Sequence, residues 1–96
     1  ALERVVELTC HNPAKLFNLY PKKGTIQVGS DADIAIVDLE MEKTVNPANL
    51  YSHSDYSLYE GWTLKGWPCQ TILRGKTVMK DGTIVGEKGA GKFIPR

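Results

Sequence analysis

The run of residues closest to a known chemical motif is Gly86–Lys92, which reads Gly-Glu-Lys-Gly-Ala-Gly-Lys. It fits the first seven positions of a phosphate-binding loop, in which backbone N–H groups and a lysine hold phosphate oxygens. The eighth position of that loop is a serine or threonine that reaches magnesium, and here it is Phe93. The loop must also lead into a helix whose N-terminus faces the phosphates. We therefore predict that this segment binds no nucleotide.

Three other groups of reactive side chains have simpler structural interpretations. Ser52–Asp55 contains the residue types of a catalytic triad, but adjacent loop residues rarely converge as a triad requires. Cys10 and His11 lack the C-x₂-C, H-x-H or H-E-x-x-H spacing of a zinc site. Asp31 and Asp33 lie in a predicted turn, where aspartates commonly bond backbone N–H groups. We expect no catalytic, cofactor-binding or metal-binding residue in this chain.

The composition is that of an ordinary soluble domain. The 96 residues carry a net charge of +1, with basic and acidic residues interspersed. This balance argues against nucleic acid or an anionic membrane surface as a partner, and no apolar run approaches the ~20 residues of a membrane span. Cys10 and Cys69 are too few to staple a secreted domain. We expect two reduced thiols and a cytoplasmic location.

The pattern of apolar residues predicts a mainly β fold with short N-terminal helices. Spacings of three and four at Leu2–Leu8 favour a helix, and Asn12 and Pro13 suit the start of a second one that ends near Leu19. The remaining pattern is of strands and turns. We expect strands at 24–28, 34–37, 38–45, 69–73, 77–79 and 83–85, with an Asp81-Gly82 hairpin turn and an extended tail over 86–96.

A stretch without clear periodicity, residues 48–68, holds an unusual number of aromatic side chains. Exposed aromatic residues at this density indicate a contact surface, and Tyr and Trp are enriched where subunits meet. Glu60, in the same stretch, has no partner that the sequence identifies. The candidate subunit-interface residues are Tyr51, Tyr56, Tyr59, Glu60, Trp62 and Trp67.

Taken together, these segments resemble the closing region of the amidohydrolase superfamily. Residues 12–21, 23–26 and 28–34 carry the resemblance to the superfamily as a whole. Residues 54–61, the 66–82 hairpin and the 89–96 tail narrow it to the D-hydantoinase/dihydropyrimidinase group. One departure is Asn18, where the family usually has glycine. Asparagine is the next-best residue for a left-handed helix end, so we expect the same backbone there.

The resemblance implies a parent enzyme that opens cyclic amide rings, hydantoins or dihydropyrimidines, at two divalent metals, usually zinc, bridged by a carboxylated lysine. None of the family's metal ligands maps onto this sequence. Residues 1–22 would pack on a (β/α)₈ barrel, and residues 23–85 would form the C-terminal part of a composite β-sandwich. The sandwich borrows strands from elsewhere in the parent, so the 34–37 strand would expose an edge here, and the isolated piece would be marginally stable.

The implied partners are the rest of the parent hydrolase and neighbouring subunits of a homo-oligomer. Two alternatives remain open at this point. The first is that the parent is a non-catalytic, dihydropyrimidinase-like scaffold protein, which this sequence does not separate from the enzyme because the deciding metal ligands lie outside it. The chain could also be an independent β-rich binding module.

Overall fold

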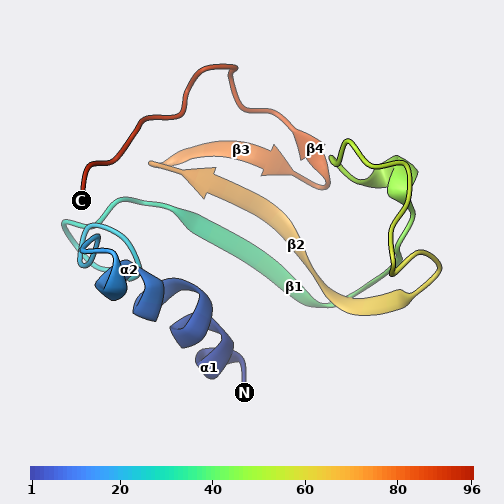
Figure 1. Ribbon diagram of the computed structural model, residues 1–96, viewed down its shortest axis with the longest axis horizontal. Helices are drawn as coiled ribbons and strands as arrows, with labels where there is room; N and C mark the ends of the chain where they lie inside the picture. Colours follow the sequence, from blue (N-terminus) through green and yellow to red (C-terminus); the bar gives the residue numbers. More distant parts are fainter.

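The computed structural model describes residues 1–96 and combines an N-terminal helix, a four-stranded antiparallel sheet and a long loop (Figure 1). The helix consists of α1 (Leu2–Val6), a π-helical turn η1 (Glu7–His11) and α2 (Asn12–Leu16). The strands are β1 (Ile34–Thr44), β2 (Thr63–Leu73), β3 (Lys76–Lys80) and β4 (Thr83–Ile84), and a short 3₁₀ turn, η2 (Pro47–Asn49), lies in the loop between β1 and β2.

The N-terminal segment is one helix, because α1, η1 and α2 follow one another without a break. A regular α-helix would bring the ring of Pro13 against the carbonyl of Thr9, four residues earlier. The wider π turn directly before α2 relieves this clash, and the Asn12 N–H bonds the carbonyl of Glu7. The prediction of two helices separated at residues 11–13, with Asn12 as an N-cap, is therefore wrong. Asn12 has helical dihedral angles and its side chain caps nothing.

The helix ends at Asn18 in the backbone conformation that the sequence predicts. Asn18 has a φ of 59°, in the left-handed region. The Leu19 N–H bonds the Ala14 carbonyl at 2.7 Å, and the Asn18 N–H bonds the Lys15 carbonyl at 3.2 Å. These two bonds form a Schellman motif, which satisfies carbonyls that the end of a helix leaves free.

The segment after the helix, residues 20–33, forms turns. The strand predicted at 24–28 is wrong, since these residues pair with no other strand and leave the side chains of Ile26 and Val28 almost fully exposed. The chain instead passes close to the helix at Gly24. Its carbonyl lies 3.3 Å from His11 Nδ1, and its φ is +84°.

The sheet has the order β1-β2-β3-β4, which leaves one edge of β1 without a neighbour. The exposed edge predicted for residues 34–37 is therefore confirmed. β1 also continues through the predicted 38–45 stretch to Thr44, whose hydroxyl bonds that of Thr63 on β2 at 2.9 Å. The apolar residues of the predicted 34–37 strand are half exposed in this chain: Ile36 is 42% and Val37 46% accessible.

β2 begins at Thr63, six positions before the predicted strand, so the long loop ends at Trp62. The proline at position 68 hid the first half of the strand from sequence reasoning, because proline cannot donate to a ladder and is confined to irregular positions. Here Pro68 pairs with Val37 directly after a register shift. The ladder is therefore already interrupted where the proline lies.

The hairpin predicted at Asp81–Gly82 is present. Both residues have positive φ, 49° and 80°, as a type I′ turn requires. β4 then ends at Ile84, and the tail that follows contains no regular element. The tail runs back toward the helix (Figure 1), where the Arg96 guanidinium lies 5.9 Å from the centre of the Phe17 ring.

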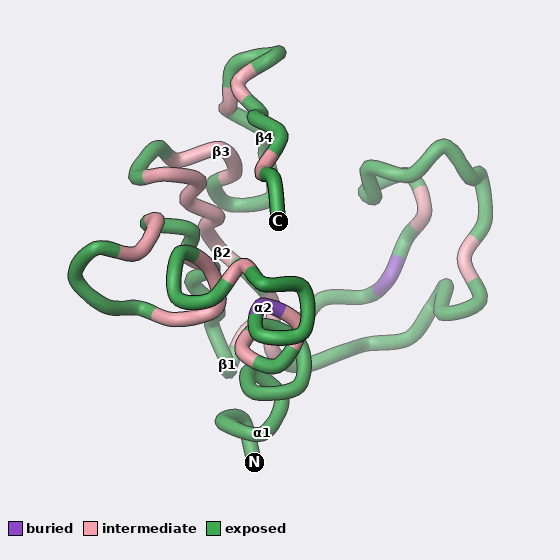
Figure 2. Tube along the Cα trace, turned by 60° about the vertical axis from the view of Figure 1, so that its left-hand side comes forward, coloured by how far each residue is buried: buried purple, intermediate pink, exposed green.

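Almost nothing is fully buried in this chain. Ala14 on α2 and Val45 after β1 are the two buried residues among 96, and Figure 2 shows them far apart along the trace. No helix is both long enough and apolar enough to cross a membrane. Because a folded domain depends on buried apolar area, the marginal stability of the isolated chain stays a prediction that this burial supports.

The close approach at Gly24 generates a prediction about stability. A Cβ at this position would lie 2.5 Å from Ala14 Cβ and 3.1 Å from the Cys10 carbonyl, at positive φ. We expect Gly24→Ala to lower the free energy of opening of the contact between Gly24 and the helix by about 2–5 kcal/mol, because backbone strain and overpacking add together. Hydrogen exchange of residues 8–25 in the intact protein measures this. Gly29→Ala is the matched control, because Gly29 has a φ of +94° and open space around it. Equal losses in the two variants would contradict the packing argument.

Candidate functional site

The predicted interface residues of the loop present a continuous set of exposed aromatic side chains. Tyr56, Tyr59 and Trp62 are all more than half exposed. Tyr59 and Trp62 contact each other edge to face, with ring centroids 5.2 Å apart. The Tyr59 N–H bonds the Ser57 hydroxyl, and the Trp62 N–H bonds the Tyr59 carbonyl, so a tight turn fixes both rings. The structure therefore brings Tyr59 and Trp62 together, with Tyr56 exposed in the same loop, and we name these three residues the aromatic tip.

Two of the predicted interface residues lie apart from the aromatic tip. Trp67 is on β2 and half buried, its Nε1 donates to the Leu64 carbonyl at 2.7 Å, and the Lys43 ammonium lies 5.7 Å from its ring centre. Tyr51 reaches across to the sheet, where its hydroxyl donates to the Gly82 carbonyl at 3.0 Å. These two rings are part of the wall between loop and sheet.

Of the Ser52–Asp55 run, Ser52 bonds the loop backbone: its hydroxyl accepts the Ser54 N–H at 3.2 Å. Glu60 makes no ion pair within the chain.

The two thiols, Cys10 and Cys69, are free. Cys10 is exposed, and Cys69 contacts the Ile36 carbonyl at 3.4 Å.

No three histidine, cysteine, aspartate or glutamate side chains of this chain lie close enough together to hold a metal ion. His11, beside Cys10, is occupied in packing: its ring contacts Tyr20 edge to face at 5.0 Å, and Nδ1 faces the Gly24 carbonyl. The residues present therefore do not form a metal-ligand set.

A second exposed apolar surface lies along the helix. Leu8, Leu16 and Phe17 border a shallow hollow, and all three are exposed. No helical segment contacts a strand, so the sheet does not cover this face. The exposed apolar residues of the helix and its end are Leu2, Val5, Val6, Leu8, Leu16 and Phe17.

An ion cluster joins the turn segment to the sheet, and sequence reasoning identified only half of it. Asp33 and Asp31 both bind the Lys23 ammonium, with Asp31 Oδ2 at 2.8 Å. The other oxygen of Asp33 accepts the N–H of Arg74, at the tip of the β2–β3 hairpin, at 2.9 Å. The prediction that the aspartates are turn residues that bond backbone is confirmed for Asp33. The part of Lys23 was missed, because ten residues separate it from Asp33.

The cluster shifts the pKa values of two of its members. Partial burial alone would raise the pKa of Asp33, but the hydrogen bonds and charges of Lys23 and Arg74 outweigh it and hold the pKa below its usual value. For Lys23, burial alone would lower the pKa, and the two aspartates raise it above its usual value. Both groups are thus held in their charged forms by the fold.

The whole of this chain, including its helix, sheet and loop, matches known proteins. A family model described as "Amidohydrolase family" matches residues 1–78. The chain is 45% identical to an L-hydantoinase of Paenarthrobacter aurescens and 46% identical to a D-hydantoinase of Ralstonia pickettii, over 96 residues in each case. Each match covers 100% of this chain and 21% of the relative, so the chain spans about one fifth of the proteins it matches.

Solved structures give the same result. The L-hydantoinase (dihydropyrimidinase) from Arthrobacter aurescens matches with a TM-score of 0.95 and 45% identity, over 100% of this chain and 21% of that one. A D-hydantoinase (dihydropyrimidinase) from Thermus sp. matches with a TM-score of 0.90 and 41% identity, over 96% of this chain and 20% of that one. The resemblance predicted from the sequence is confirmed.

The lowered pKa of Asp33 predicts how stability depends on pH. An unfolded aspartate titrates at about 3.9. In the folded state the Asp33 carboxyl binds its proton less readily than in the unfolded state. The contribution of Asp33 to the free energy of unfolding is therefore complete above the unfolded-state pKa and is lost as pH falls through the lower, folded-state pKa. We expect Asp33→Asn to lower the free energy of unfolding by about 1 kcal/mol at pH 6 and by less at pH 3. Urea denaturation at the two pH values measures this.

Asp55→Asn is the control for Asp33→Asn, because Asp55 lies in the loop and makes no ion pair. It should have little effect at either pH. A loss for Asp33→Asn that is the same at pH 6 and pH 3 would show that the carboxylate charge contributes nothing.

Proposed function

The chain belongs to the amidohydrolase family, and we propose that it is the C-terminal structural segment of a metal-dependent hydrolase that opens cyclic amide rings, such as hydantoins and dihydropyrimidines. One observation carries this proposal: the chain matches proteins named hydantoinase along all of its length while spanning 21% of theirs. The non-catalytic scaffold and the independent binding module have no comparable support among these relatives.

The proposed metals, two divalent ions such as zinc bridged by a carboxylated lysine, belong to the parent protein outside these 96 residues. No group of side chains in this chain fits them. When bound, such ions supply a hydroxide near neutral pH and polarise a carbonyl. This chain's own contribution is to position other parts of the protein, and none of its residues is assigned a catalytic role.

Each exposed surface fits a place in the proposed parent. The apolar helix face of residues 1–22 would pack on a (β/α)₈ barrel, and its exposed leucines, valines and phenylalanine support a covered position. Residues 23–85 would form part of a composite β-sandwich, which the unpaired edge of β1 supports. The free thiols of Cys10 and Cys69 support the cytoplasm as the location.

The aromatic tip and the tail would form contacts between the subunits of a homo-oligomer. The 45–62 loop lies to one side of the sheet (Figure 1), and the three residues of the tip are between 53% and 68% exposed. Large aromatic side chains held in a fixed turn lose little conformational entropy when a partner covers them. This supports an assembly surface at the tip.

The proposed activity has a direct test. We expect the intact protein that carries this chain to hydrolyse hydantoin or dihydrouracil, releasing the ring-opened carbamoyl acid. Removal of metal with a chelator should abolish turnover, and zinc should restore it. An intact protein that contains two metal ions per chain but turns over neither substrate nor their 5-substituted analogues would refute the proposed activity. If it bound no metal at all, it would be the non-catalytic relative.

The assembly role predicts a change in the sedimentation of the intact protein. Trp62→Ala combined with Tyr59→Ala should move the enzyme toward smaller oligomers, because the edge-to-face pair is the centre of the tip. Val28→Ala is the control, since Val28 is fully exposed but lies outside the loop. An unchanged sedimentation profile in the double variant would rule out the tip as a subunit contact.

A further inference from the structure

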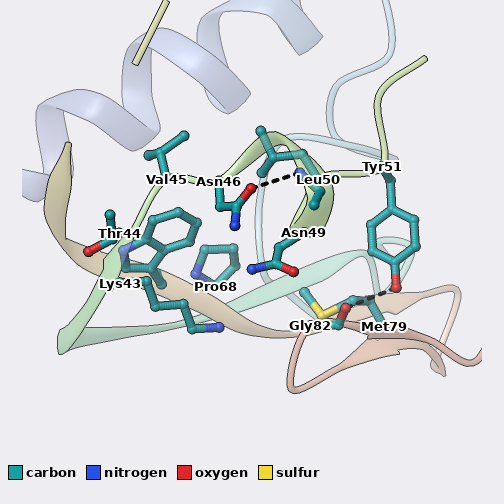
Figure 3. Close-up of a pocket in the computed structure, with 12 residues that line it drawn as sticks. Lys43, Thr44, Val45, Asn46, Asn49, Leu50, Tyr51, Pro68, Met79 and Gly82 are labelled. Carbon is teal, nitrogen blue, oxygen red and sulfur yellow. Dashed lines mark hydrogen bonds between the residues drawn. The ribbon is translucent and has the colours of Figure 1, made fainter. Parts of the chain in front are cut away.

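A hollow of about 780 Å³ lies between the sheet and the start of the long loop (Figure 3). We define the loop–sheet hollow by its twelve lining residues, which come from the end of β1, the turn η2, the middle of β2, and the β3–β4 hairpin. They are Lys43, Thr44, Val45, Asn46, Ala48, Asn49, Leu50, Tyr51, Trp67, Pro68, Met79 and Gly82. Its volume is within the range of ~300–1,000 Å³ that is usual for small-molecule sites.

The hollow has a fixed frame. The Tyr51 hydroxyl donates to the Gly82 carbonyl at 3.0 Å and accepts the Ile84 N–H at 3.3 Å, which ties the loop to the β3–β4 hairpin. On the other side, Asn46 Oδ1 accepts the Ala48 N–H at 3.0 Å and caps η2. Both walls are thus held by hydrogen bonds that need no ligand.

The lining of the hollow carries positive charge and no negative charge. Lys43 is the one lining residue that is charged at neutral pH, and no carboxylate lines the hollow. Because Asn46 Oδ1 faces the Ala48 N–H, the side-chain NH₂ of Asn46 is free to donate. Figure 3 shows the nitrogen ends of Lys43, Asn46 and Asn49 around the same space. The Lys43 ammonium, with no carboxylate to neutralise it, and the free NH₂ of Asn46 together favour an anion at this end of the hollow.

Half of the lining residues are apolar. Pro68 forms the floor on β2, Met79 lies on β3, and Leu50 faces them from the loop (Figure 3). Trp67 completes the wall beside Lys43. Such surfaces take the body of a ligand while a few polar groups fix its orientation. An aromatic ring fits this lining better than a sugar or a second charge, since a polar group placed there would lose its water without a partner.

We propose that the loop–sheet hollow is a binding site for a small aromatic carboxylate, with the carboxylate at Lys43 and Asn46 and the ring against Pro68, Met79 and Leu50. No residue that lines the hollow is a candidate for metal binding or catalysis. The proposed binding depends on neither the cyclic amidase activity nor the oligomer.

The experiment uses the intact protein labelled with 5-fluorotryptophan, with the Trp67 signal assigned by its loss in Trp67→Phe. The probes are 3-phenylpropanoate, its neutral amide, and acetate. We expect 3-phenylpropanoate to shift the Trp67 signal in a saturable way. The amide, which lacks the charge, and acetate, which lacks the ring, should each bind at least about tenfold more weakly, because charge-assisted bonds and ring burial each contribute on that scale.

The matched variants are Lys43→Gln and Lys80→Gln. Both remove one exposed lysine from a strand, but Lys80 does not line the hollow. Lys43→Gln should weaken binding of 3-phenylpropanoate about tenfold or more, while Lys80→Gln should leave it unchanged. Equal binding of acid and amide, or full affinity in Lys43→Gln, would overturn the proposal. A Trp67 signal that does not respond to any probe would also overturn it, and would show that another part of the protein fills the hollow.

Discussion

The position of the helix relative to the sheet depends on one carboxylate, that of Asp33. No helical segment contacts a strand, so the two parts are joined through the 20–33 turns and through the tail, where Arg96 lies over the Phe17 ring. Asp33 holds Lys23 with one oxygen and the backbone of Arg74 with the other, and the Gly75 N–H adds a bond to the Ala32 carbonyl at 3.0 Å. The 20–33 turns and the β2–β3 hairpin, about 40 positions apart in the sequence, therefore meet at one side chain.

A polar junction of this kind is needed because the chain has so little interior. With two fully buried residues, packing cannot fix the relative position of helix and sheet. Directional contacts can, provided that their geometry is good and water is partly excluded. The Lys23 side chain meets this condition, since only 16% of it is exposed although it carries a charge. The apolar faces of the helix and the edge of β1 are then free to be covered by the rest of a longer polypeptide.

The features that could be predicted from the sequence are those set by a few adjacent residues. The left-handed end at Asn18 and the Asp81–Gly82 turn follow from local backbone preferences, and both are present. The strand expected at 24–28 failed because alternating apolar residues indicate a strand only where a neighbour exists to pair with it. The first half of β2 was missed because Pro68 is a poor strand residue, and it is tolerated only beside a shift in the register with β1. Both errors concern pairing across the sheet, which no local pattern contains.

The candidate interface residues also show that a local pattern does not contain long-range contacts. They were grouped by composition, but the structure divides the five aromatic rings among them between two surfaces. Tyr56, Tyr59 and Trp62 project outward as the aromatic tip, while Tyr51 and Trp67 face the loop–sheet hollow. The Tyr51 hydroxyl anchors the start of the loop on the β3–β4 hairpin, 31 positions away along the chain. A contact over that separation leaves no mark in a local sequence pattern, so composition alone could not separate Tyr51 from the rings of the tip.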